Sequence, residues 1–386
     1  MFNIKLFNKI ASCGLDVFDK ALYSCSAEIT EPDAVMVRSA ALHDESFPQS
    51  LKAIARAGAG VNNIPLDRCT DEGICVFNTP GANANAVKEL ALCALLISSR
   101  KITDGIAWVK TLSGDTVAAD VEKGKNAFVG PEISGKTLGV VGLGAIGAMV
   151  ANDAEKLGMK VIGYDAYLSV KGALRLSPAI KLADSLDELL GVSDYITVHI
   201  PSVPETRGMF NSSVISKMKP GTRLINLSRG DLAVNGDILA ALESGALSAY
   251  VTDFPDGELA GKRGVIAMPH LGASTPESED NCAVMAAKEL IGYLEAGNVV
   301  NSVNFPCVAL PFSASAAHRF TVCFKAGFDI KNVTDVLSSA GIRASAFTSQ
   351  TRGNAGYAIF DTDGSAVGVS AIISALDKVT RVNIIK

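Results

Sequence analysis

Thr137-Leu-Gly-Val-Val141 runs directly into Gly142-Leu-Gly-Ala-Ile-Gly147, and this stretch decides the fold of the chain's central part. The apolar run is typical of a buried strand, and Ala145–Leu157 has the composition of a helix that begins inside the glycine turn. A second apolar run, Lys160–Tyr164, leads to Asp165, which lies 23 residues after Gly142. A strand, a glycine turn, a helix and a strand in this order predict a βαβ unit that binds a dinucleotide.

Each glycine of the turn has a separate task in such a unit. Gly142 allows the tight turn, Gly144 lets the backbone approach a pyrophosphate, and Gly147 lets the helix pack closely on the strand. The helix N-terminus offers amide hydrogens to the phosphates. Asp165 is placed to accept hydrogen bonds from a ribose. We expect NAD rather than NADP, because a carboxylate repels a 2′-phosphate and the following Ala-Tyr-Leu-Ser supplies no arginine.

The chain before this motif predicts another α/β unit, over about residues 1–86. The expected strands are Asn3–Phe7, Ala34–Val37, Lys52–Ala55 and Ile74–Phe77. Continuous apolar strands with helices between them favour a parallel sheet covered on both faces. Ala84–Thr111, rich in Ala and Leu and free of proline, predicts one long helix that leaves this unit.

The chain after the motif continues the second α/β unit. Ser185-Leu-Asp-Glu188 fits a capping box that opens a short helix. Ser278–Ala296 predicts a long amphipathic helix that ends at Gly297. The further expected strands are Tyr195–His199, Arg223–Leu227, Ser248–Thr252 and Val265–Met268.

From about Arg319 the pattern changes to a small β-α-β-β-α-β unit, preceded by a linker over residues 301–315 with two prolines. The order predicts a split βαβ fold. Its expected strands are Arg319–Phe324, Arg343–Gln350, Tyr357–Asp361 and Val379–Ile385, and its expected helices are Ile330–Ala340 and Ala366–Leu376.

Composition narrows the classes of function. The 386 residues suggest two or three domains, and 48% hydrophobic against 19% charged residues indicates well-formed cores. A net charge of −5 argues against a nucleic-acid or membrane-surface binder, and 6% aromatic residues argue against base-stacking platforms. No apolar run reaches the ~18 residues that a membrane span needs, and the first residues lack the pattern of a signal peptide. We expect a cytoplasmic protein.

Cysteine and histidine usage gives no sign of a metal. None of the eight cysteines forms a C-x-x-C pair and there are only four histidines, so we expect no metal site and cysteines that remain reduced.

Charged side chains follow three strands of the second unit. Arg229 follows one strand, Asp253 and Glu258 follow the next, and His270 follows the last. In open α/β sheets this edge binds ligands. A guanidinium to grip a carboxylate, an imidazole to take a hydroxyl proton and a carboxylate to orient that imidazole suffice to oxidise a 2-hydroxy acid.

Several stretches together resemble the family of D-isomer-specific 2-hydroxyacid dehydrogenases over about residues 35–305. The resemblance implies two doubly wound parallel-sheet domains, a flavodoxin-like substrate domain and a Rossmann NAD domain. We expect the first from residues 1–86 with 280–305 and the second from residues 87–279. The stretches are Val37-Arg-Ser, Arg56-Ala-Gly-Ala-Gly-Val-Asn-Asn, Val76-Phe-Asn-Thr-Pro-Gly, Gly142–Gly147, His199-Ile-Pro, Ile225-Asn-Leu-Ser-Arg-Gly and Met268-Pro-His-Leu-Gly-Ala-Ser-Thr.

The resemblance also implies roles for residues. Arg229, Glu258 and His270 would be catalytic. His199 fits equally a core histidine and the wall of an adenine or ribose pocket. The implied NAD contacts are Gly142, Gly144, Ala145, Ile146, Gly147, Asp165, His199, Leu227, Ser228, Arg229, Asp253, His270, Gly272 and Ala273. The implied substrate contacts are Arg38, Ser39, Arg56, Ala59, Gly60, Val61 and Arg229, and amides of residues 59–61 would form a small anion nest.

One stretch departs from the family. The pattern after the Asp253 strand is D-V-F-x-x-E-P, whereas this chain has Asp253-Phe-Pro-Asp-Gly-Glu258-Leu. The spacing from Asp253 to Glu258 is kept, but the flanking residues differ. Asp256 is therefore an alternative partner for His270, although Glu258 is favoured.

The expected activity is NAD-dependent oxidation of 3-phospho-D-glycerate, in a homodimer or larger homo-oligomer. One alternative is a glyoxylate or hydroxypyruvate reductase of the family, which would usually end near residue 305. The other is an NAD-sensing, corepressor-like binding protein without turnover. The tail, residues 316–386, resembles the ACT domain, a small regulatory module. Its Phe324-Lys-Ala-Gly327 turn lacks the Asn and Pro of amino-acid-binding copies, so we expect little serine inhibition.

Overall fold

The computed structural model describes residues 1–311 and 317–385. The chain divides into two compact units, one formed by Met1–Asn83 with Pro276–Lys386 and the other by Ala84–Thr275. The second unit is continuous in sequence, whereas the first is built from both ends of the chain.

The continuous unit contains a seven-stranded parallel sheet in the order β12-β11-β10-β9-β6-β7-β8. The strand order reverses between β6 and β9, which is the doubly wound arrangement expected from the glycine motif. Its strands are β6 (Thr137–Val141), β7 (Lys160–Tyr164), β8 (Lys181–Leu182), β9 (Tyr195–Val198), β10 (Thr222–Asn226), β11 (Leu247–Thr252) and β12 (Val265–Ala267). Only the two-residue β8 has no counterpart in the sequence prediction, because its exposed Lys-Leu gives no strand signal.

Helices cover both faces of this sheet, and apolar side chains fill the space on each side. The helical segments are α3 (Ala84–Arg100), α4 (Ile102–Val109), α5 (Val117–Gly124), η1 (Lys125–Phe128), α6 (Ala145–Lys156), α7 (Val170–Ala173), α8 (Leu186–Val192), α9 (Ser212–Ile215), η2 (Gly230–Leu232) and α10 (Asn235–Ser244). The predicted capping box is present, since the Ser185 hydroxyl accepts a hydrogen bond from the Glu188 amide at the start of α8.

The prediction of one helix over Ala84–Thr111 is wrong. Lys101 adopts a left-handed conformation with φ of 46°, which ends α3 and starts α4 in a new direction. The returning chain packs against the end of α3, where the Ser99 hydroxyl donates to the Pro131 carbonyl. The helix therefore ends at this tertiary contact, although the helical propensity of the sequence continues beyond it.

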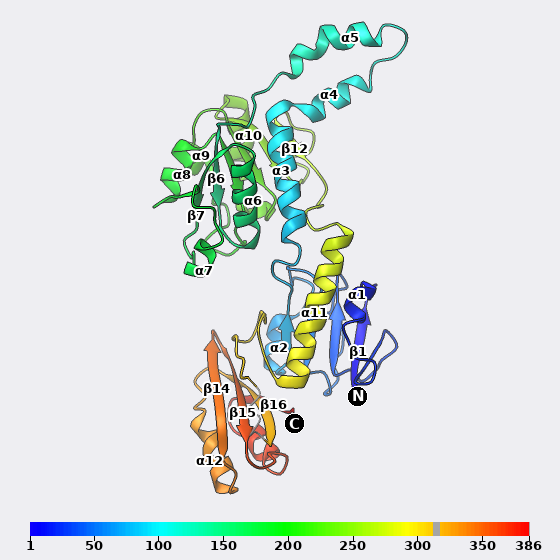
Figure 1. Cartoon of the computed structure of the whole chain (residues 1–386), viewed down its shortest axis with the longest axis vertical. Coiled ribbons are helices and arrows are strands. Elements are labelled where there is room, and N and C mark those ends of the chain that lie inside the picture. Colours follow the sequence, from blue (N-terminus) through cyan, green and yellow to red (C-terminus); the bar gives the residue numbers. More distant parts are fainter. Residues whose placement is uncertain (312–316, 386) are drawn as a thin grey trace. The chain divides into compact units, whose positions relative to one another are not determined.

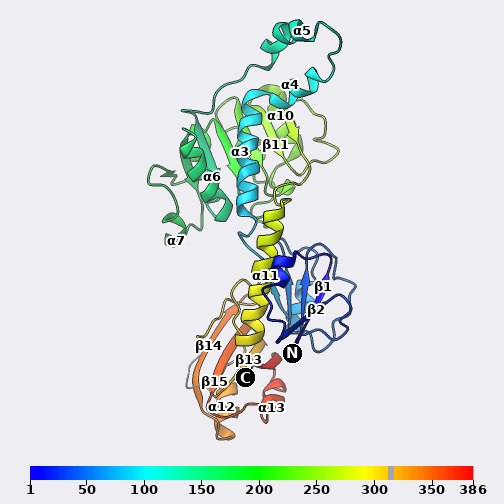
Figure 2. The same cartoon turned by 45° about the vertical axis from the view of Figure 1, so that its right-hand side comes forward.

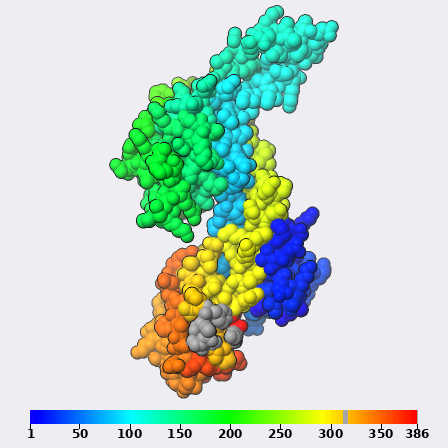
Figure 3. Space-filling model, viewed as in Figure 1, coloured from blue at the N-terminus to red at the C-terminus, as the bar shows by residue number. Residues whose placement is uncertain are grey.

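The segment from α4 to η1 forms a projecting hairpin, seen in cyan in Figures 1 and 3. None of its helical residues is buried. The Trp108 and Phe128 rings lie 5.2 Å apart and hold the two arms together.

The first unit begins with a five-stranded parallel sheet in the order β2-β1-β3-β4-β5. The sequence did not predict β2, because Tyr-Ser-Cys-Ser lacks a β-branched run. Its strands are β1 (Phe2–Phe7), β2 (Tyr23–Ser26), β3 (Ala34–Val37), β4 (Ala53–Arg56) and β5 (Cys75–Phe77), and its short helices are α1 (Ser12–Leu15) and α2 (Leu66–Asp71).

The long helix α11 (Pro276–Ala296), seen in yellow in Figure 2, completes the core of this sheet. It packs against β3, β4 and α1, and Gly14 of α1 approaches it so closely that an added Cβ would lie 2.6 Å from the Ala283 Cβ. A small residue is therefore required where the two helices meet.

The tail forms a four-stranded antiparallel sheet in the order β14-β15-β13-β16, which confirms the predicted β-α-β-β-α-β unit. The end of the expected linker, residues 312–315, lies outside the described residues. The tail elements are β13 (His318–Lys325), α12 (Lys331–Ser339), β14 (Ala344–Arg352), β15 (Ala355–Thr362), α13 (Ser370–Ser374) and β16 (Val379–Ile384).

Both faces of the two central tail strands are buried. Alternate residues such as Phe320 and Phe360 face α12 and α13, whereas Cys323 and Tyr357 join the same core as α11 and β5. The Tyr357 hydroxyl donates to the Gly297 carbonyl at the end of α11. The tail is thus packed against the N-terminal sheet of its own chain rather than held on a free linker.

A buried ion pair lies at this junction. The Arg319 guanidinium binds both carboxylate oxygens of Asp361, at 2.6 and 2.8 Å, and neither side chain is exposed. Arg319 also donates to the carbonyls of Ala296, Leu310 and Pro311. The pair therefore ties the end of α11 and the connecting segment to the tail sheet.

Candidate active site

The glycine turn at the end of β6 leaves space for a ligand. Gly142 has φ of +92°, and an added Cβ would lie 2.4 Å from the His199 carbonyl oxygen. A Cβ on Gly147 would lie 1.9 Å from the Gly142 carbonyl oxygen. A Cβ on Gly144, by contrast, would meet nothing within 4 Å. The fold therefore requires glycine at positions 142 and 147, whereas Gly144 leaves the space in front of the turn open to a ligand.

The N-terminus of α6 lies at this opening. Gly144 is its N-cap, so Ala145 and Ile146 form its first turn and no side chain caps their amides. Uncapped amides at the start of a 12-residue helix fit an anionic phosphate group.

Asp165 stands beside the turn, at the end of β7. Its Oδ2 accepts a hydrogen bond of 2.8 Å from the Leu143 amide and its Oδ1 one of 2.8 Å from the Tyr167 amide. The carboxylate is thereby fixed next to the glycine turn, where a nucleotide ribose would lie. These residues fit NAD.

His199 follows β9 and lies directly behind Gly142. Its Nε2 is 2.9 Å from the Thr197 hydroxyl, and burial lowers the pKa of the imidazole to about 4. In the described part of the chain its Nδ1 is buried without a hydrogen-bond partner. His199 is therefore a neutral histidine that packs behind the turn, with one ring nitrogen left for a ligand or water.

The loop after β10 carries Arg229 and is braced by side chains. The Asn226 amide donates to the Arg229 carbonyl at 2.9 Å, and the Ser228 hydroxyl donates to the Val198 carbonyl at 2.7 Å. This bracing fixes the course of Leu227–Arg229 across the carboxyl ends of two strands. The Arg229 side chain is exposed, and its Nη1 donates to the Ser228 carbonyl.

Asp253 and His270 come together at the ends of β11 and β12. Asp253 is buried, and an added Cβ on Gly272 would lie 3.4 Å from its Oδ2. Burial raises the pKa of Asp253, while the charges of His270 and Arg229 act to lower it. The Asp253 carboxylate thus lies within electrostatic reach of the His270 imidazole and of the Arg229 guanidinium. The sequence assigned the role of orienting His270 to Glu258 rather than to Asp253. Ala273 follows in the same loop and is half-buried.

His270 is exposed and packs on Phe254, with ring centroids 4.5 Å apart. Phe254 stands where the family pattern has Val, so the departure seen in the sequence lies against the imidazole. The contact was not predicted, although the changed residue was the available signal.

Neither alternative carboxylate is hydrogen-bonded to His270. Among the residues described, no hydrogen bond or ion pair joins the imidazole to Glu258 or Asp256. Asp256 is occupied locally, because it accepts from the Asn235 side chain at 2.6 Å and from the amides of Glu258 and Leu259. The Glu258 side chain lies on an exposed turn.

The first unit carries its own candidate anion site at the carboxyl edge of its sheet. Arg38 follows β3, Arg56 ends β4, and the Arg56 Nε donates to the Arg38 carbonyl at 3.0 Å. The Arg38 guanidinium contacts the Glu279 carboxylate at 2.5 Å. Sequence reasoning missed Glu279, which lies in the first turn of α11 and gives no local signal of this contact.

The neighbouring loop is partly occupied by contacts within the unit. The Ser39 amide donates to the Asn8 side chain, and the Ala59 carbonyl accepts from Asn78. The amides of Gly60 and Val61 lie in the same half-buried loop. All the predicted substrate residues except Arg229 therefore lie in the first unit, whereas Arg229 belongs to the second.

No three His, Cys, Asp or Glu side chains gather as metal ligands anywhere in residues 1–311 or 317–385. All eight cysteines are free thiols. Over the same described residues, no helix combines the length and apolar character that crossing a bilayer requires.

Comparison with known families identifies the class to which this architecture belongs. Residues 92–273 match the family model for the "D-isomer specific 2-hydroxyacid dehydrogenase, NAD binding domain". The chain belongs to the D-isomer specific 2-hydroxyacid dehydrogenase family, and NAD is the cofactor of the matched domain.

The similar proteins include D-3-phosphoglycerate dehydrogenases. The protein of that name from Bacillus subtilis is 33% identical over 326 residues, covering 80% of this chain and 60% of the relative. The one from Synechocystis is 38% identical over 287 residues, covering 72% of this chain and 50% of the relative. The chain thus spans about half to three fifths of the length of these relatives.

The fold is shared with solved structures. D-mandelate dehydrogenase from Rhodotorula graminis aligns with a TM-score of 0.67 and 23% identity, over 80% of this chain and 99% of that one. At this identity the likeness concerns the fold alone.

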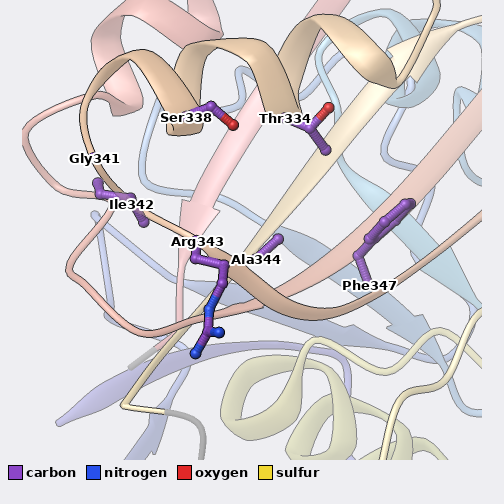
Figure 4. Close-up of a pocket in the computed structure, with 7 residues that line it drawn as sticks. All are labelled: Thr334, Ser338, Gly341, Ile342, Arg343, Ala344 and Phe347. Atoms are coloured by element: carbon purple, nitrogen blue, oxygen red, sulfur yellow. The ribbon is translucent and has the colours of Figure 1, made fainter.

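A separate surface pocket of about 450 Å³ lies in the tail, between the end of α12 and the start of β14 (Figure 4). Thr334 and Ser338 line it from the helix and Phe347 lines it from β14, whereas the Arg343 side chain extends away from the helix. The Arg343 guanidinium is already paired with Asp363 at 3.4 Å.

Proposed function

We propose that the protein oxidises 3-phospho-D-glycerate to 3-phosphohydroxypyruvate with NAD, as the first step of L-serine synthesis. The observation that carries the proposal is the grouping of Arg229, Asp253 and His270 at the carboxyl edge of the sheet that also holds the glycine turn. The names of the similar proteins support the choice of substrate.

The residues divide the chemistry between them. Arg229 pairs with the substrate carboxylate and fixes the orientation of the hydroxyl-bearing carbon. The His270 imidazole takes the hydroxyl proton while the C–H bond breaks, leaving the 2-oxo group. NAD, when bound, supplies the hydride acceptor. Glu258 is the proposed carboxylate that orients His270 and stabilises the protonated imidazole, whereas Asp256 is hydrogen-bonded to Asn235.

The phosphate end of the substrate needs cations beyond Arg229. We assign Arg38 and Arg56 to it, because both stand at strand ends of one sheet edge and touch each other through the Arg38 carbonyl. We accordingly propose a substrate domain of residues 1–86 with 280–305 and an NAD domain of residues 87–279.

The tail is proposed to be an ACT-like domain that serves stability or assembly. Its sheet order is that of a split βαβ fold. Lys325, the last residue of β13 and the charged residue of Phe324-Lys-Ala-Gly327, pairs with Asp71 at 2.8 Å. The Lys325 ammonium therefore already has a carboxylate partner and is less available to the carboxylate of a bound serine. This supports the expectation of little or no serine inhibition. We further propose a homodimer or larger homo-oligomer in the cytoplasm, where free thiols remain reduced.

A substrate panel followed at the NADH absorbance tests the function. We expect turnover of 3-phospho-D-glycerate with NAD, and a loss of roughly 10²–10⁴-fold in His270→Ala with NAD affinity kept. Activity only on glyoxylate or hydroxypyruvate would favour the reductase, and NAD binding without any turnover would favour the sensor.

The partner of His270 is tested separately. Glu258→Gln should move the acid limb of the pH–rate profile to lower pH, because a carboxylate favours the imidazolium. If Asp256→Asn moved the limb and Glu258→Gln did not, the choice of Glu258 would be wrong.

A further inference from the structure

A pocket in the first unit lies along one flank of α11, away from the two arginines. Met285, Lys288, Glu289 and Gly292 face it from the helix at spacings of three and four residues. Phe77 at the end of β5 and the returning segment with Val300 form the other wall. The pocket holds about 290 Å³, which is room for a small organic group.

One wall of this pocket has free space at the position of a missing side chain. A Cβ added to Gly292 would meet nothing within 4 Å, although the glycine sits inside a helix. A helical glycine that no backbone contact requires costs stability relative to alanine. Because Gly292 has no side chain, this flank of α11 stays open.

Four polar side chains line the pocket, from Lys288, Glu289, Asn298 and Asn301. The Glu289 carboxyl has one oxygen that is hydrogen-bonded and one that is not. The Glu289 Oε1 accepts a hydrogen bond of 2.6 Å from the Asn301 side chain, which fixes the orientation of the group. Its Oε2 is buried and lacks a partner within the described residues. Burial of an unpaired carboxylate oxygen is costly unless a donor reaches it.

We infer that this pocket is a binding site for a small primary ammonium ion carried on a short apolar chain. The ammonium would donate to the Glu289 Oε2, and the chain would lie against Phe77, Met285 and Val300 above Gly292. The site lies outside the proposed catalytic residues and does not depend on the proposed function.

Protonation of Glu289 controls this binding. Burial raises the pKa of Glu289 to about 7, and the Asn301 hydrogen bond opposes that rise. The other ionisable side chain lining the pocket is Lys288, on the same helix, and its positive charge repels a bound cation. Binding an ammonium therefore requires the ionised carboxylate, which is present above pH 7 and is lost as the pH falls.

The test uses the full chain with n-butylammonium as the probe, followed by ligand-observed NMR, with n-butanol as the uncharged control. We expect saturable millimolar binding of n-butylammonium at pH 8 and about tenfold weaker binding at pH 6, since a group with a pKa near 7 is mostly protonated there. Binding of n-butanol should be weak at both pH values.

Two variants locate the site. Glu289→Gln keeps the shape and should abolish both the binding and its pH dependence. Gly292→Leu should block the pocket, whereas Gly236→Leu on α10, another helical glycine with open space above it, should not. Equal binding by the wild type, Glu289→Gln and Gly292→Leu, or no saturable binding by the wild type at pH 8, would overturn the inference.

Discussion

At the scale of single residues, Asp165 has two tasks that a substitution can separate. Its carboxylate accepts hydrogen bonds from the Leu143 and Tyr167 amides. The same carboxylate is the proposed partner of the NAD ribose. Asp165→Asn keeps an oxygen for one amide but removes the charge that repels a 2′-phosphate. We expect weaker NAD binding and a smaller preference for NAD over NADP, measured as a ratio of kcat/KM values. An unchanged ratio with intact folding would contradict the assignment.

Glu279 leads to a second residue-level prediction, which rests on the proposed substrate. Its carboxylate occupies the Arg38 guanidinium at 2.5 Å, with both side chains about two fifths exposed. A phosphate that binds Arg38 must compete with it. Glu279→Gln should lower KM for 3-phospho-D-glycerate by about three- to fivefold, in keeping with the modest strength of exposed ion pairs.

The control for Glu279→Gln is an unphosphorylated substrate. KM for D-glycerate should stay the same, because that molecule has no phosphate to place on Arg38. A rise in KM for the phosphorylated acid would instead mean that Glu279 orients Arg38 for binding.

At the scale of elements, sequence patterns predicted most strands to within a residue or two. β3, β6 and β7 have the bounds expected for them, because buried parallel strands are continuous apolar runs bordered by Gly, Pro or Asn. The missed break at Lys101 has a tertiary cause, since the returning chain at Pro131 packs on the end of α3. No residue near Lys101 signals such a break locally.

In the candidate site, too, the sequence indicated residues at local positions in the chain but not the contacts between distant segments. Strand-end positions indicated Arg229, Asp253, Glu258 and His270, because the carboxyl ends of parallel strands meet at one edge. A hydrogen bond between Glu258 and His270, the favoured pair, is not among those of the described residues. Sequence spacing could not show that Glu279 reaches Arg38 or that Phe254 packs on His270, since these contacts depend on how separate segments approach one another.

The hairpin from α4 to η1 gives a prediction at this scale. It holds the only tryptophan of the chain, Trp108, and none of its helical residues is buried. A segment with so little buried surface should open before the sheet it projects from. Tryptophan fluorescence in urea should therefore change at a lower midpoint than far-UV circular dichroism. Coincident midpoints would mean that another surface stabilises the hairpin.

At the scale of the whole molecule, the tail and the N-terminal sheet share one core. Tyr293 and Phe305 pack with Tyr357 of β15, and Cys323 lies in the same cluster as Cys75. Removing the tail exposes these side chains, at a cost of about 1.5–3 kcal/mol for each large apolar group.

Ending the chain at Pro311 should therefore destabilise the first unit and leave NAD binding by the second unit nearly unchanged. A cut nearer Ser313 falls outside the described residues. Hydrogen exchange should become faster in β5 and α11 and stay slow in β6 and β10, and titration with NAD should give nearly the full-length affinity. Unchanged exchange in β5 and α11 would contradict the shared core, and lost NAD binding would contradict the independence of the second unit.

The shared core also sets an order of events during synthesis. The second unit is a continuous stretch, so Ala84–Thr275 can fold as soon as it has left the ribosome. The N-terminal sheet is made before this unit, yet its core includes Tyr293, Phe305 and Ile359, which are made only after the whole second unit. The sheet of residues 2–77 must therefore remain without part of its core while the second unit is made, and a chaperone that shields apolar surface would be needed longest at this sheet.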